Sequence, residues 1–376
     1  MALAIQRGQP ARGFILPYDN ADEAALVDGM CIYPARTLLQ VCTHLKGLDD
    51  ASRIAPHRAG KPVTHPAYPD FADVKGQQQV KRALEIAACG LHSILMVGPP
   101  GSGKSMLAAR FPGLLPPMSD EEALEAAAVQ SLSTGFHLKN WKQRPFRSPH
   151  HTSSGVALVG GGSVPRPGEI SLAHHGVLFL DELPEYSRRT LEALREPLEA
   201  GRVVIARALH AAQFPARFQL IAAMNPCPCG WRGHPVRACV CKPDQIARYV
   251  GKISGPLLDR IDLHVALPPS DPESVAGPPG EASGHVLERV TRCRQRQHDR
   301  QGKLNAALSG AELDQHCVMQ ADAQALLFQA MRRLSGSGRA LHRALRVART
   351  IADLEGADAL AASHVAQAVQ YRRPGL

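Results

Sequence analysis

The stretch Ile94-Leu-Met-Val-Gly-Pro-Pro-Gly-Ser-Gly-Lys-Ser105 decides the fold of this chain. Its four apolar residues predict a buried strand, the pattern G-x-x-x-x-G-K-[ST] follows at once, and a helix is predicted from Met106. A strand, a glycine-rich loop and a helix in this order are typical of a phosphate-binding loop, because backbone amides and a helix N-terminus attract phosphate charge. The alternative is a glycine-rich turn with a chance lysine. The residues expected to surround the phosphates of ATP are Gly98, Pro99, Pro100, Gly101, Ser102, Gly103, Lys104, Ser105 and Met106.

Two acidic residues supply the rest of the expected chemistry. We expect Lys104 to reach the β- and γ-phosphates and Ser105 to ligate Mg²⁺. The apolar run Val177–Leu180 predicts a buried parallel strand that ends at Asp181 and Glu182. Asp181 would hold Mg²⁺, and Glu182 would polarise the attacking water as the catalytic base. The alternative for this pair is the acidic first turn of a helix.

A third predicted strand, Phe218–Met224, ends at Asn225. A neutral amide at that position can hydrogen-bond both the γ-phosphate and the attacking water without repelling either. Asn225 can also be read as a plain turn residue, because Pro226 follows it.

Composition shifts divide the chain. Proline-rich linkers are predicted at 50–69 and 268–284. Between them, over 70–267, helices alternate with apolar strands, which predicts an α/β core with a central parallel sheet. The segment 285–376 shows only helical patterns and predicts an all-helical lid domain. Its helices are expected at His285–Lys303, Asp322–Leu334, Gly338–Leu354 and Ala362–Tyr371.

The first 49 residues predict two short strand–helix units. Gly13–Leu16 and Ile32–Tyr33 are the expected strands, with helices over Ala21–Val27, capped by Asn20, and over Ala35–Lys46. Two such units cannot cover both faces of a sheet, so we expect them to belong to a larger domain whose beginning is missing.

Composition narrows the class of protein. The chain has 376 residues, of which 44% are apolar, and no apolar run approaches the length of a membrane span. No secretory signal is visible and the nine cysteines do not resemble a disulfide framework, which predicts a cytoplasmic protein. The net charge of +9 suits a polyanionic partner, whereas 5% aromatic residues are too few for binding single strands mainly by base stacking.

Several longer segments resemble one family. The order of motifs is similar to that of AAA+ ATPases, and within them to the magnesium-chelatase-like branch and its ComM (YifB) family. Phe71–Gln77 resembles the segment that closes over adenine in AAA+ proteins. The segments that carry the finer resemblance are Arg144–His151, Ala157–Gly162, Pro167–His174, Ser254–Asp262 and Leu345–Asp353. Residues 1–49 resemble only the last part of a Lon-protease-like domain.

The resemblance implies a homo-oligomeric ring, commonly a hexamer, with ATP between subunits. Arg260 matches the arginine that reaches the neighbour's γ-phosphate; its alternative is an ion pair with Asp259 or Asp262. Arg339 matches the lid arginine that contacts ATP, with Arg343 as the second candidate. The spacing of the stripe Arg339, Arg343, Arg346 and Arg349 otherwise predicts a solvated basic face.

The family acts on DNA, driving branch migration in natural transformation, and this function is expected here by resemblance. One alternative is a magnesium-chelatase motor subunit that drives metal insertion through a partner protein. Another is a chain that binds nucleotide without turning it over. A stimulation of ATP hydrolysis by DNA would separate the first from the other two.

Two further segments are candidate working surfaces. Thr152–Gly168 is rich in glycine, serine and proline, which predicts a mobile loop, and by resemblance it holds the insertion that faces the ring channel. Residues 202–207 predict a hairpin with the strand that leads to Phe218, its tip near Ala208–Ala212. By resemblance Arg202, Arg207 and His210 are candidate DNA-backbone contacts; ordinary solubilising charge is the alternative.

Four cysteines form the pattern C-x-C-x₉-C-x-C, namely Cys227, Cys229, Cys239 and Cys241. Four thiolates can enclose a tetrahedral structural Zn²⁺, although the spacing within each pair is tighter than the usual C-x₂-C, and four reduced thiols are the alternative. The histidine pairs at 150–151 and 174–175 are interpreted as loop residues rather than metal ligands.

Overall fold

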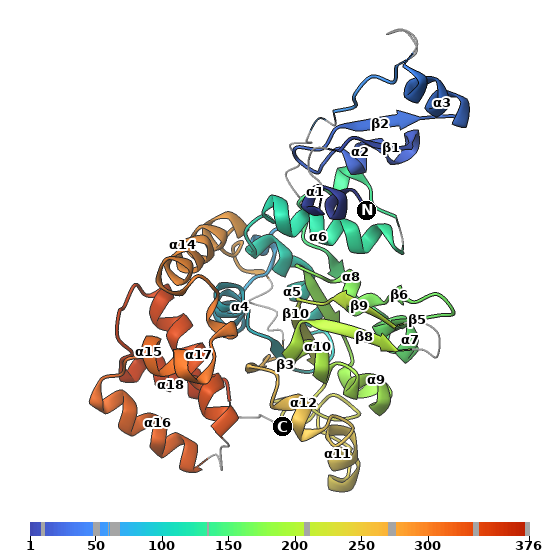
Figure 1. Cartoon of the computed structure of the whole chain (residues 1–376). Helices are drawn as coiled ribbons and strands as arrows, with labels where there is room; N and C mark the ends of the chain where they lie inside the picture. The colour runs from blue at the N-terminus through green and yellow to red at the C-terminus, as the bar shows by residue number, and fades with distance from the viewer. Residues whose placement is uncertain are drawn as a thin grey trace. The chain divides into compact units, whose positions relative to one another are not determined.

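The chain folds into two compact units (Figure 1). A computed structural model describes residues 1–8, 12–47, 53–58, 60, 68–133, 135–206, 211–269, 276–333 and 338–372. The first unit combines Met1–Pro66 with Pro117–Gln143, and the second combines Ala67–Pro116 with Arg144–Leu376. Within the described residues, the structure contains no helix of the length and apolarity that spanning a membrane requires.

The first unit is built on two parallel strands, β1 (Phe14–Pro17) and β2 (Ile32–Ala35). Helix α3 (Leu38–Lys46) is capped by the Thr37 hydroxyl and ends at Gly47, as predicted for its end. The helix expected over Ala21–Val27 is only α2 (Ala21–Ala24), and the Asn20 side chain makes no cap hydrogen bond. A single turn gains little from a cap, since most helical stability comes from packing.

Residues 117–143 join this first unit, although their sequence position predicted that they belong to the core. Their helix α6 (Asp120–Ser131) begins with a capping box between Ser119 and Glu122. Ala123, Ala126 and Trp141 are buried together with Leu26, so the segment shares a small apolar cluster with the N-terminal residues. Helix α1 (Ala2–Gly8) completes this unit among the described residues.

The second unit contains a five-stranded parallel sheet, which confirms the predicted α/β core. Except for a two-residue edge strand, its strands are fully or largely apolar, as expected where both faces of a sheet are covered. Strands far apart in sequence are neighbours, so the carboxyl ends of β3, β10 and β7 lie side by side. In spatial order the strands are β11 (Leu263–Ala266), β3 (Ile94–Val97), β10 (Gln219–Met224), β7 (Val177–Leu180) and β4 (Phe146–Arg147).

The side chains of the sheet belong to two clusters of buried apolar residues. One cluster also contains residues of the helical domain, and the other also contains residues of an antiparallel hairpin. The core helices are α4 (Gln78–Gly90), α5 (Lys104–Arg110), α8 (Glu169–Leu172), α9 (Arg188–Glu192), α10 (Arg195–Ala200), α11 (Pro243–Val250) and α12 (Gly255–Leu258). The hairpin is formed by β8 (Arg202–Ala206) and β9 (Ala211–Pro215), which confirms the predicted hairpin, although Ala211 and Ala212, expected at its tip, belong to β9.

The segment Thr152–Gly168, predicted to be a mobile loop, has regular structure. It contains α7 (Gly155–Val159), capped by the Ser154 hydroxyl, and a short antiparallel pair, β5 (Gly160–Gly161) and β6 (Arg166–Pro167). Leu158 is fully buried in the same layer as the hairpin. The prediction from composition was wrong here because one buried leucine and a tight strand pair order a glycine-rich segment.

The C-terminal domain is helical, as predicted, and Figure 1 shows its helices gathered in orange and red beside α4. Four predicted helices are found within two residues of their expected ends. The short helix α15 (Gly310–His316) was not predicted, because seven residues are too few to show a clear helical repeat of apolar positions. The helices are α14 (Ser283–Gln301), α15 (Gly310–His316), α16 (Ala321–Arg333), α17 (Gly338–Leu354) and α18 (Ala362–Gln370).

The arginine stripe of α17 is largely internal, which corrects the expectation of a solvated basic face. Arg346 donates to the carbonyl of Leu308. Arg349 is 1% exposed, pairs with Asp353, and donates to backbone carbonyls of the loop that follows α17. Other helices surround α17, so its arginines satisfy buried acceptors, and Arg339 is the exposed member of the stripe.

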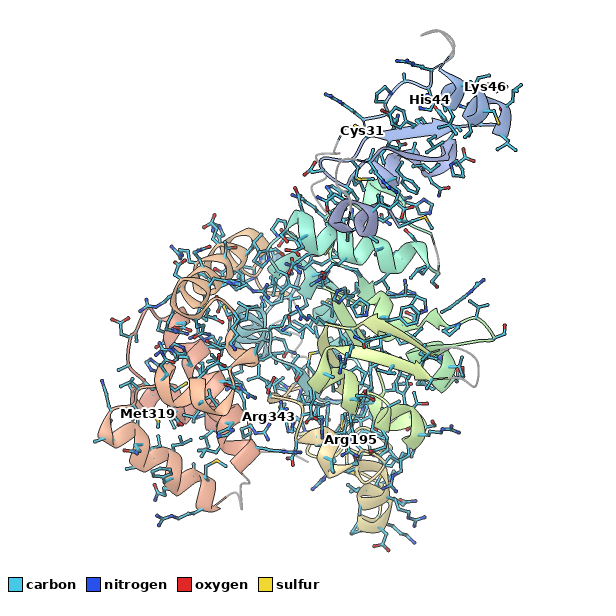
Figure 2. All side chains as sticks on the ribbon, in the orientation of Figure 1. Cys31, His44, Lys46, Arg195, Met319 and Arg343 are labelled. Carbon is cyan, nitrogen blue, oxygen red and sulfur yellow. The ribbon has the colours of Figure 1, made fainter. Side chains whose placement is uncertain are left out.

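Arg343 joins the helical domain to the sheet (Figure 2). Its Nη1 lies 2.6 Å from Oδ1 of buried Asp262 and 2.8 Å from the Arg260 carbonyl oxygen. The Ser93 amide donates to the other Asp262 oxygen, and His92 Nδ1 lies 3.6 Å from it. Burial raises the pKa of Asp262, but His92, the Arg343 charge and the Ser93 amide outweigh burial and hold the pKa well below its usual range.

Replacing Arg343 by Met should destabilise the second unit by about 3 kcal/mol, because it leaves a buried carboxylate without its cation. The matched change Arg339→Met, on the exposed start of the same helix, should change the free energy of unfolding by less than about 0.5 kcal/mol. Urea unfolding of both variants measures the difference.

The Arg343 penalty should shrink in acid. A depressed native pKa stabilises the fold above the unfolded value of about 4, and this stabilisation is lost as the pH falls. The difference in stability between wild type and Arg343→Met should therefore begin to shrink near pH 4 and disappear only as the pH falls through the depressed native pKa of Asp262. Equal stability of the two proteins at pH 7 would contradict the assignment.

Candidate functional site

The phosphate loop joins β3 to α5 at the carboxyl edge of the sheet. Helix α5 begins at Lys104, two residues before the predicted start, so the amides of Lys104, Ser105 and Met106 form its first turn. Gly103 caps the helix at φ +86°, a conformation that side chains disfavour. The loop therefore aims the amides of the first helical turn at one point, as a phosphate site requires.

The Lys104 ammonium group is held at the centre of the site. Its Nζ lies 2.8 Å from the Gly98 carbonyl oxygen, 2.9 Å from that of Pro99 and 3.2 Å from Asn225 Oδ1. Burial lowers the pKa of Lys104, while Asp181 and Glu182 act in the opposite direction. A cation ringed by oxygen acceptors is suited to phosphate oxygens.

Asp181 stands at the end of β7, facing the phosphate loop. The Ser105 hydroxyl donates to Asp181 Oδ2 at 2.6 Å, and the Glu182 amide donates to Oδ1 at 2.9 Å. A hydroxyl and a carboxylate are the hard oxygen ligands that Mg²⁺ prefers together with phosphates and water. The residues present therefore fit the metal that the sequence analysis assigned to them.

Glu182 occupies a strained position with an exposed side chain. Its backbone has φ +50°, in the left-handed region, which costs a non-glycine residue on the order of 1 kcal/mol or more. Such strain persists where the surrounding structure enforces it, and it is common at functional sites. The turn directs the carboxylate away from the buried strand, where it can meet a water molecule.

His151 contacts Glu182, and sequence reasoning missed this contact. His151 Nδ1 lies 3.0 Å from Glu182 Oε2, and the ring stacks at a tilt on His150. The Tyr186 hydroxyl donates to the Pro149 carbonyl and fixes this segment beside the acids. Burial, with Asp181 and Glu182, raises the pKa of Tyr186. The available signal was position, since the segment follows β4, the neighbour of β7 in the sheet.

Asn225 reaches the site from the end of β10, the strand between β3 and β7. Its Oδ1 contact with Lys104 places the amide beside the phosphate loop. The second histidine pair is structural: His174 Nδ1 accepts from the Arg217 amide, and the His175 amide donates to the Arg217 carbonyl.

Arg260 lies in an intrasubunit ion pair, with a different acid from those expected. The side chain is 8% exposed; its Nη2 lies 2.6 Å from Glu199 Oε1, and its Nη1 donates to the Pro256 carbonyl. The expected partners are engaged elsewhere, Asp262 with Arg343 and Asp259 near Arg372. A glutamate from α10 sits within reach of Arg260 only in the folded chain, so spacing did not reveal it.

The candidate DNA contacts are placed only in part. Arg202 is the first residue of β8 and is exposed. Arg207 and His210 lie outside the described residues. Inward-facing Val203 and Ile205 anchor the strand in the core, so the alternate residues of β8, Arg202 among them, face outward.

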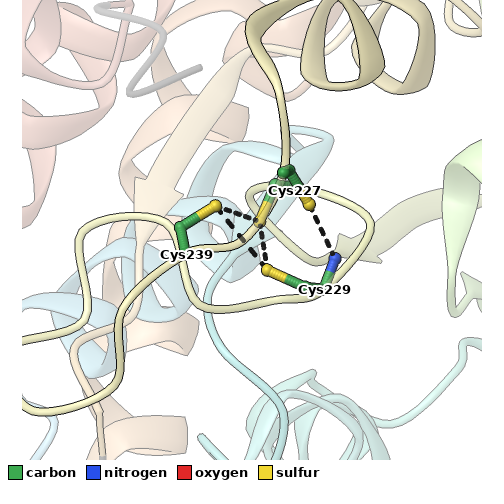
Figure 3. A group of neighbouring side chains, drawn as sticks. Cys227, Cys229 and Cys239 are labelled. Atoms are coloured by element: carbon green, nitrogen blue, oxygen red, sulfur yellow. Dashed lines mark hydrogen bonds between the residues drawn. The ribbon is translucent and has the colours of Figure 1, made fainter.

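The four cysteines converge, as the sequence predicted they could. Figure 3 shows Cys227, Cys229 and Cys239 pointing toward one another. Their sulfurs are 3.4 Å (227–229), 3.7 Å (227–239) and 3.6 Å (229–239) apart, and all four sulfurs lie within 4.8 Å of one another. A tetrahedral ion with bonds of about 2.3 Å would set sulfurs about 3.8 Å apart. The donor set therefore fits zinc.

A parallel sheet with this phosphate loop, an acidic strand end and a helical domain defines an AAA+ ATPase core. Residues 70–275 match the family described as magnesium chelatase, subunit ChlI, and residues 280–372 match its C-terminal domain. The chain belongs to the ComM/YifB family of magnesium-chelatase-like AAA+ proteins.

Relatives support this assignment. The chain is 48% identical over 365 residues to an uncharacterized YifB protein of Escherichia coli strain K12, covering 96% of this chain and 71% of the relative. It is 48% identical over 383 residues to competence protein ComM of Haemophilus influenzae, covering 98% and 73%. Identity to the 67 kDa magnesium-chelatase subunit of Heliobacterium mobile is 26% over 219 residues, covering 50% and 31%. Membership of this family implies ATP and Mg²⁺ as cofactors and ATPase activity.

Proposed function

We propose that this chain is a cytoplasmic ring motor that hydrolyses ATP to remodel DNA, with branch migration in natural transformation as its task. The observation that carries the ATPase proposal is the meeting of Lys104, Asn225 and the Ser105–Asp181 pair at the ends of three adjacent strands. Positioning and charge stabilisation supply most of the catalysis of phosphoryl transfer, and this arrangement offers both.

In the proposed reaction, water attacks the γ-phosphorus, and the bond to the β–γ bridging oxygen breaks to give ADP and phosphate. Glu182 accepts the proton of the water, for which its carboxylate must leave His151. Lys104 and Asn225 hold the γ-phosphate, and Ser105 and Asp181 would hold Mg²⁺, which neutralises phosphate charge when bound. Arg339, exposed at the start of α17, is the proposed lid contact, since Arg343 is occupied by Asp262.

Replacing Glu182 by Gln should lower ATP hydrolysis at least about 100-fold and leave ATP binding within about twofold, because only the proton acceptor is lost. The control Glu185→Gln removes an equal charge three residues away and should keep the activity. Phosphate release and binding of a fluorescent nucleotide measure the two quantities. Undiminished turnover in Glu182→Gln would remove this residue from its role.

We propose a homo-oligomeric ring, a hexamer by family resemblance, in which Arg260 completes the neighbour's site. An arginine is the suitable group, because it carries a permanent charge and a fork of donors. The side chain of its partner Glu199 is half exposed. When Arg260 leaves Glu199 to bind a phosphate of the neighbour, the released carboxylate can therefore be solvated by water.

Arg260→Ala and Glu182→Gln should each be inactive alone and regain hydrolysis when mixed. In a mixed ring the Glu182→Gln subunit supplies its arginine to a neighbour whose base is intact, and such an arginine contributes about 10³-fold or more in rate. The double variant mixed with Arg260→Ala should stay inactive. An Arg260→Ala protein that hydrolyses ATP at the wild-type rate would rule out the role in trans.

DNA is the proposed substrate because the chain is basic and because a relative is named a competence protein. Arg202, with Arg207 and His210, is proposed to contact the DNA backbone. A chelatase motor remains the rival, supported by the match to magnesium chelatase. A chain that binds nucleotide without turnover is the second rival, and the hydrolysis assays above decide it.

Forked or four-way DNA should stimulate ATP hydrolysis, and the effect should fade between about 50 and 200 mM salt, as counterion release requires. Arg202→Ala should lower the slope of log affinity against log salt by about 0.9, the value for one phosphate contact. Arg332→Ala, an equal charge change on α16, should leave the slope unchanged. Hydrolysis indifferent to DNA would favour the chelatase alternative.

We also propose that Cys227, Cys229, Cys239 and Cys241 bind one structural Zn²⁺, supported by the distances between their sulfurs. As domain boundaries we propose 1–49 for a Lon-protease-like remnant, 70–267 for the ATPase core, of which Pro117–Gln143 packs with the first unit, and 285–376 for the lid, with linkers at 50–69 and 268–284.

A further inference from the structure

The four-cysteine cluster joins two chain segments that flank the ATP site. Cys227 and Cys229 lie in the turn directly after Asn225, whereas Cys239 and Cys241 immediately precede α11. The two pairs are ten residues apart in sequence, and their sulfurs meet. A metal ion at this point would therefore fasten the end of β10 to the beginning of α11.

A backbone amide is already aimed at one of these sulfurs. The Cys229 amide donates a hydrogen bond of 3.4 Å to Cys241 Sγ. N–H groups directed at sulfur stabilise thiolates, the form that binds metal. The loop thus supplies both the sulfurs and a backbone donor to one of them. Four unrelated surface thiols would not be expected to have such a donor.

The turn of the first pair presses on the phosphate loop. The Gly230 amide donates to the Cys227 carbonyl and closes the turn. A Cβ on Gly230 would lie 2.5 Å from Pro100 Cδ and 3.8 Å from Asn225 Cγ. Gly230 has φ +82°, so both its conformation and its lack of a side chain allow this approach. The turn that contains Cys227 and Cys229 therefore packs directly against Pro100 of the phosphate loop.

The second cysteine pair, Cys239 and Cys241, is connected to the neighbourhood of Asn225 through helix α11. Its Tyr249 is buried; burial raises the pKa of the Tyr249 hydroxyl, and the backbone of Asn225 beside it acts in the opposite direction. The side chain of Asn225 in turn contacts Lys104. The two halves of the cluster thus reach the phosphate loop and Asn225 by separate routes, one through Gly230 and one through Tyr249.

We infer that the four cysteines form a zinc brace that sets the geometry of the phosphate loop and of Asn225, so that ATP binding depends on zinc occupancy. This inference rests on the proposed zinc site and on the proposed ATP site. The brace acts by positioning, since no cysteine is placed in contact with the reacting atoms. Displacements of about 1 Å in such supports can cost up to about 100-fold in activity.

The first test uses the metal itself. The purified full chain should contain one zinc per chain, and removal by a chelator should weaken nucleotide binding about tenfold or more, with recovery on adding zinc back. Cys239→Ser with Cys241→Ser should lose both zinc and tight nucleotide binding. A chain that binds no zinc even when zinc is supplied, or one that binds nucleotide equally well without zinc, would overturn the inference.

The second test separates the brace from the metal. Gly230→Ala should keep its zinc but weaken nucleotide binding, because the methyl group collides with Pro100. The matched control is Gly233→Ala, in the same loop with φ +76° and open space around its Cβ position, so it carries the same backbone strain without the collision. Nucleotide binding is measured with a fluorescent ADP analogue, which requires no hydrolysis. Equal binding by the two variants would contradict the brace, whereas failure of the ATPase proposal alone would show only in the Glu182→Gln assay.

Discussion

The buried carboxylate of Asp262 is the constraint on which the second unit depends. A charged group out of water is costly unless opposite charge and hydrogen bonds surround it, and here they come from both sides. Ser93, before β3, supplies its amide, and Arg343 supplies its charge from the helical domain. The helical domain cannot leave the sheet without uncovering this carboxylate.

The same junction holds the backbone that carries Arg260. The Arg260 carbonyl accepts from Arg343, and the Ile261 carbonyl accepts from Arg372 Nη1 at 2.7 Å. The helical domain thus donates hydrogen bonds to two successive carbonyl groups of the segment between α12 and β11. The orientation of the proposed trans-acting arginine is therefore coupled to the helical domain of its own subunit, which is the domain that carries Arg339.

Sequence patterns predicted the elements whose signals are local. Continuous apolar runs identified β3, β7 and β10, and parallel strands end at one edge of a sheet, so the sequence alone indicated that Lys104, Asp181 and Asn225 lie near one another. This reasoning works because residues that directly follow parallel strands must lie at the same edge of the sheet, however far apart they are in sequence. The cysteine cluster was also within reach, since its two pairs flank a single short loop.

Side-chain partnerships that arise only on folding were out of reach. The contact of His151 with Glu182 and that of Arg260 with Glu199 each join residues on different elements. Arg349 was misjudged because helical spacing reports a face but not what covers it. Burial by neighbouring helices turns an apparently solvated arginine into an internal one, and a single sequence carries no record of those neighbours.

The β8–β9 hairpin has a mechanical consequence. Its inward residues Val203, Ile205 and Phe214 are buried in the same apolar layer as Leu178 and Leu180 of β7, the strand that ends at Asp181. Close-packed interiors transmit displacement rather than absorb it. The hairpin strands are therefore packed against the acidic strand, and a shift of that strand would displace β8 and β9 with it.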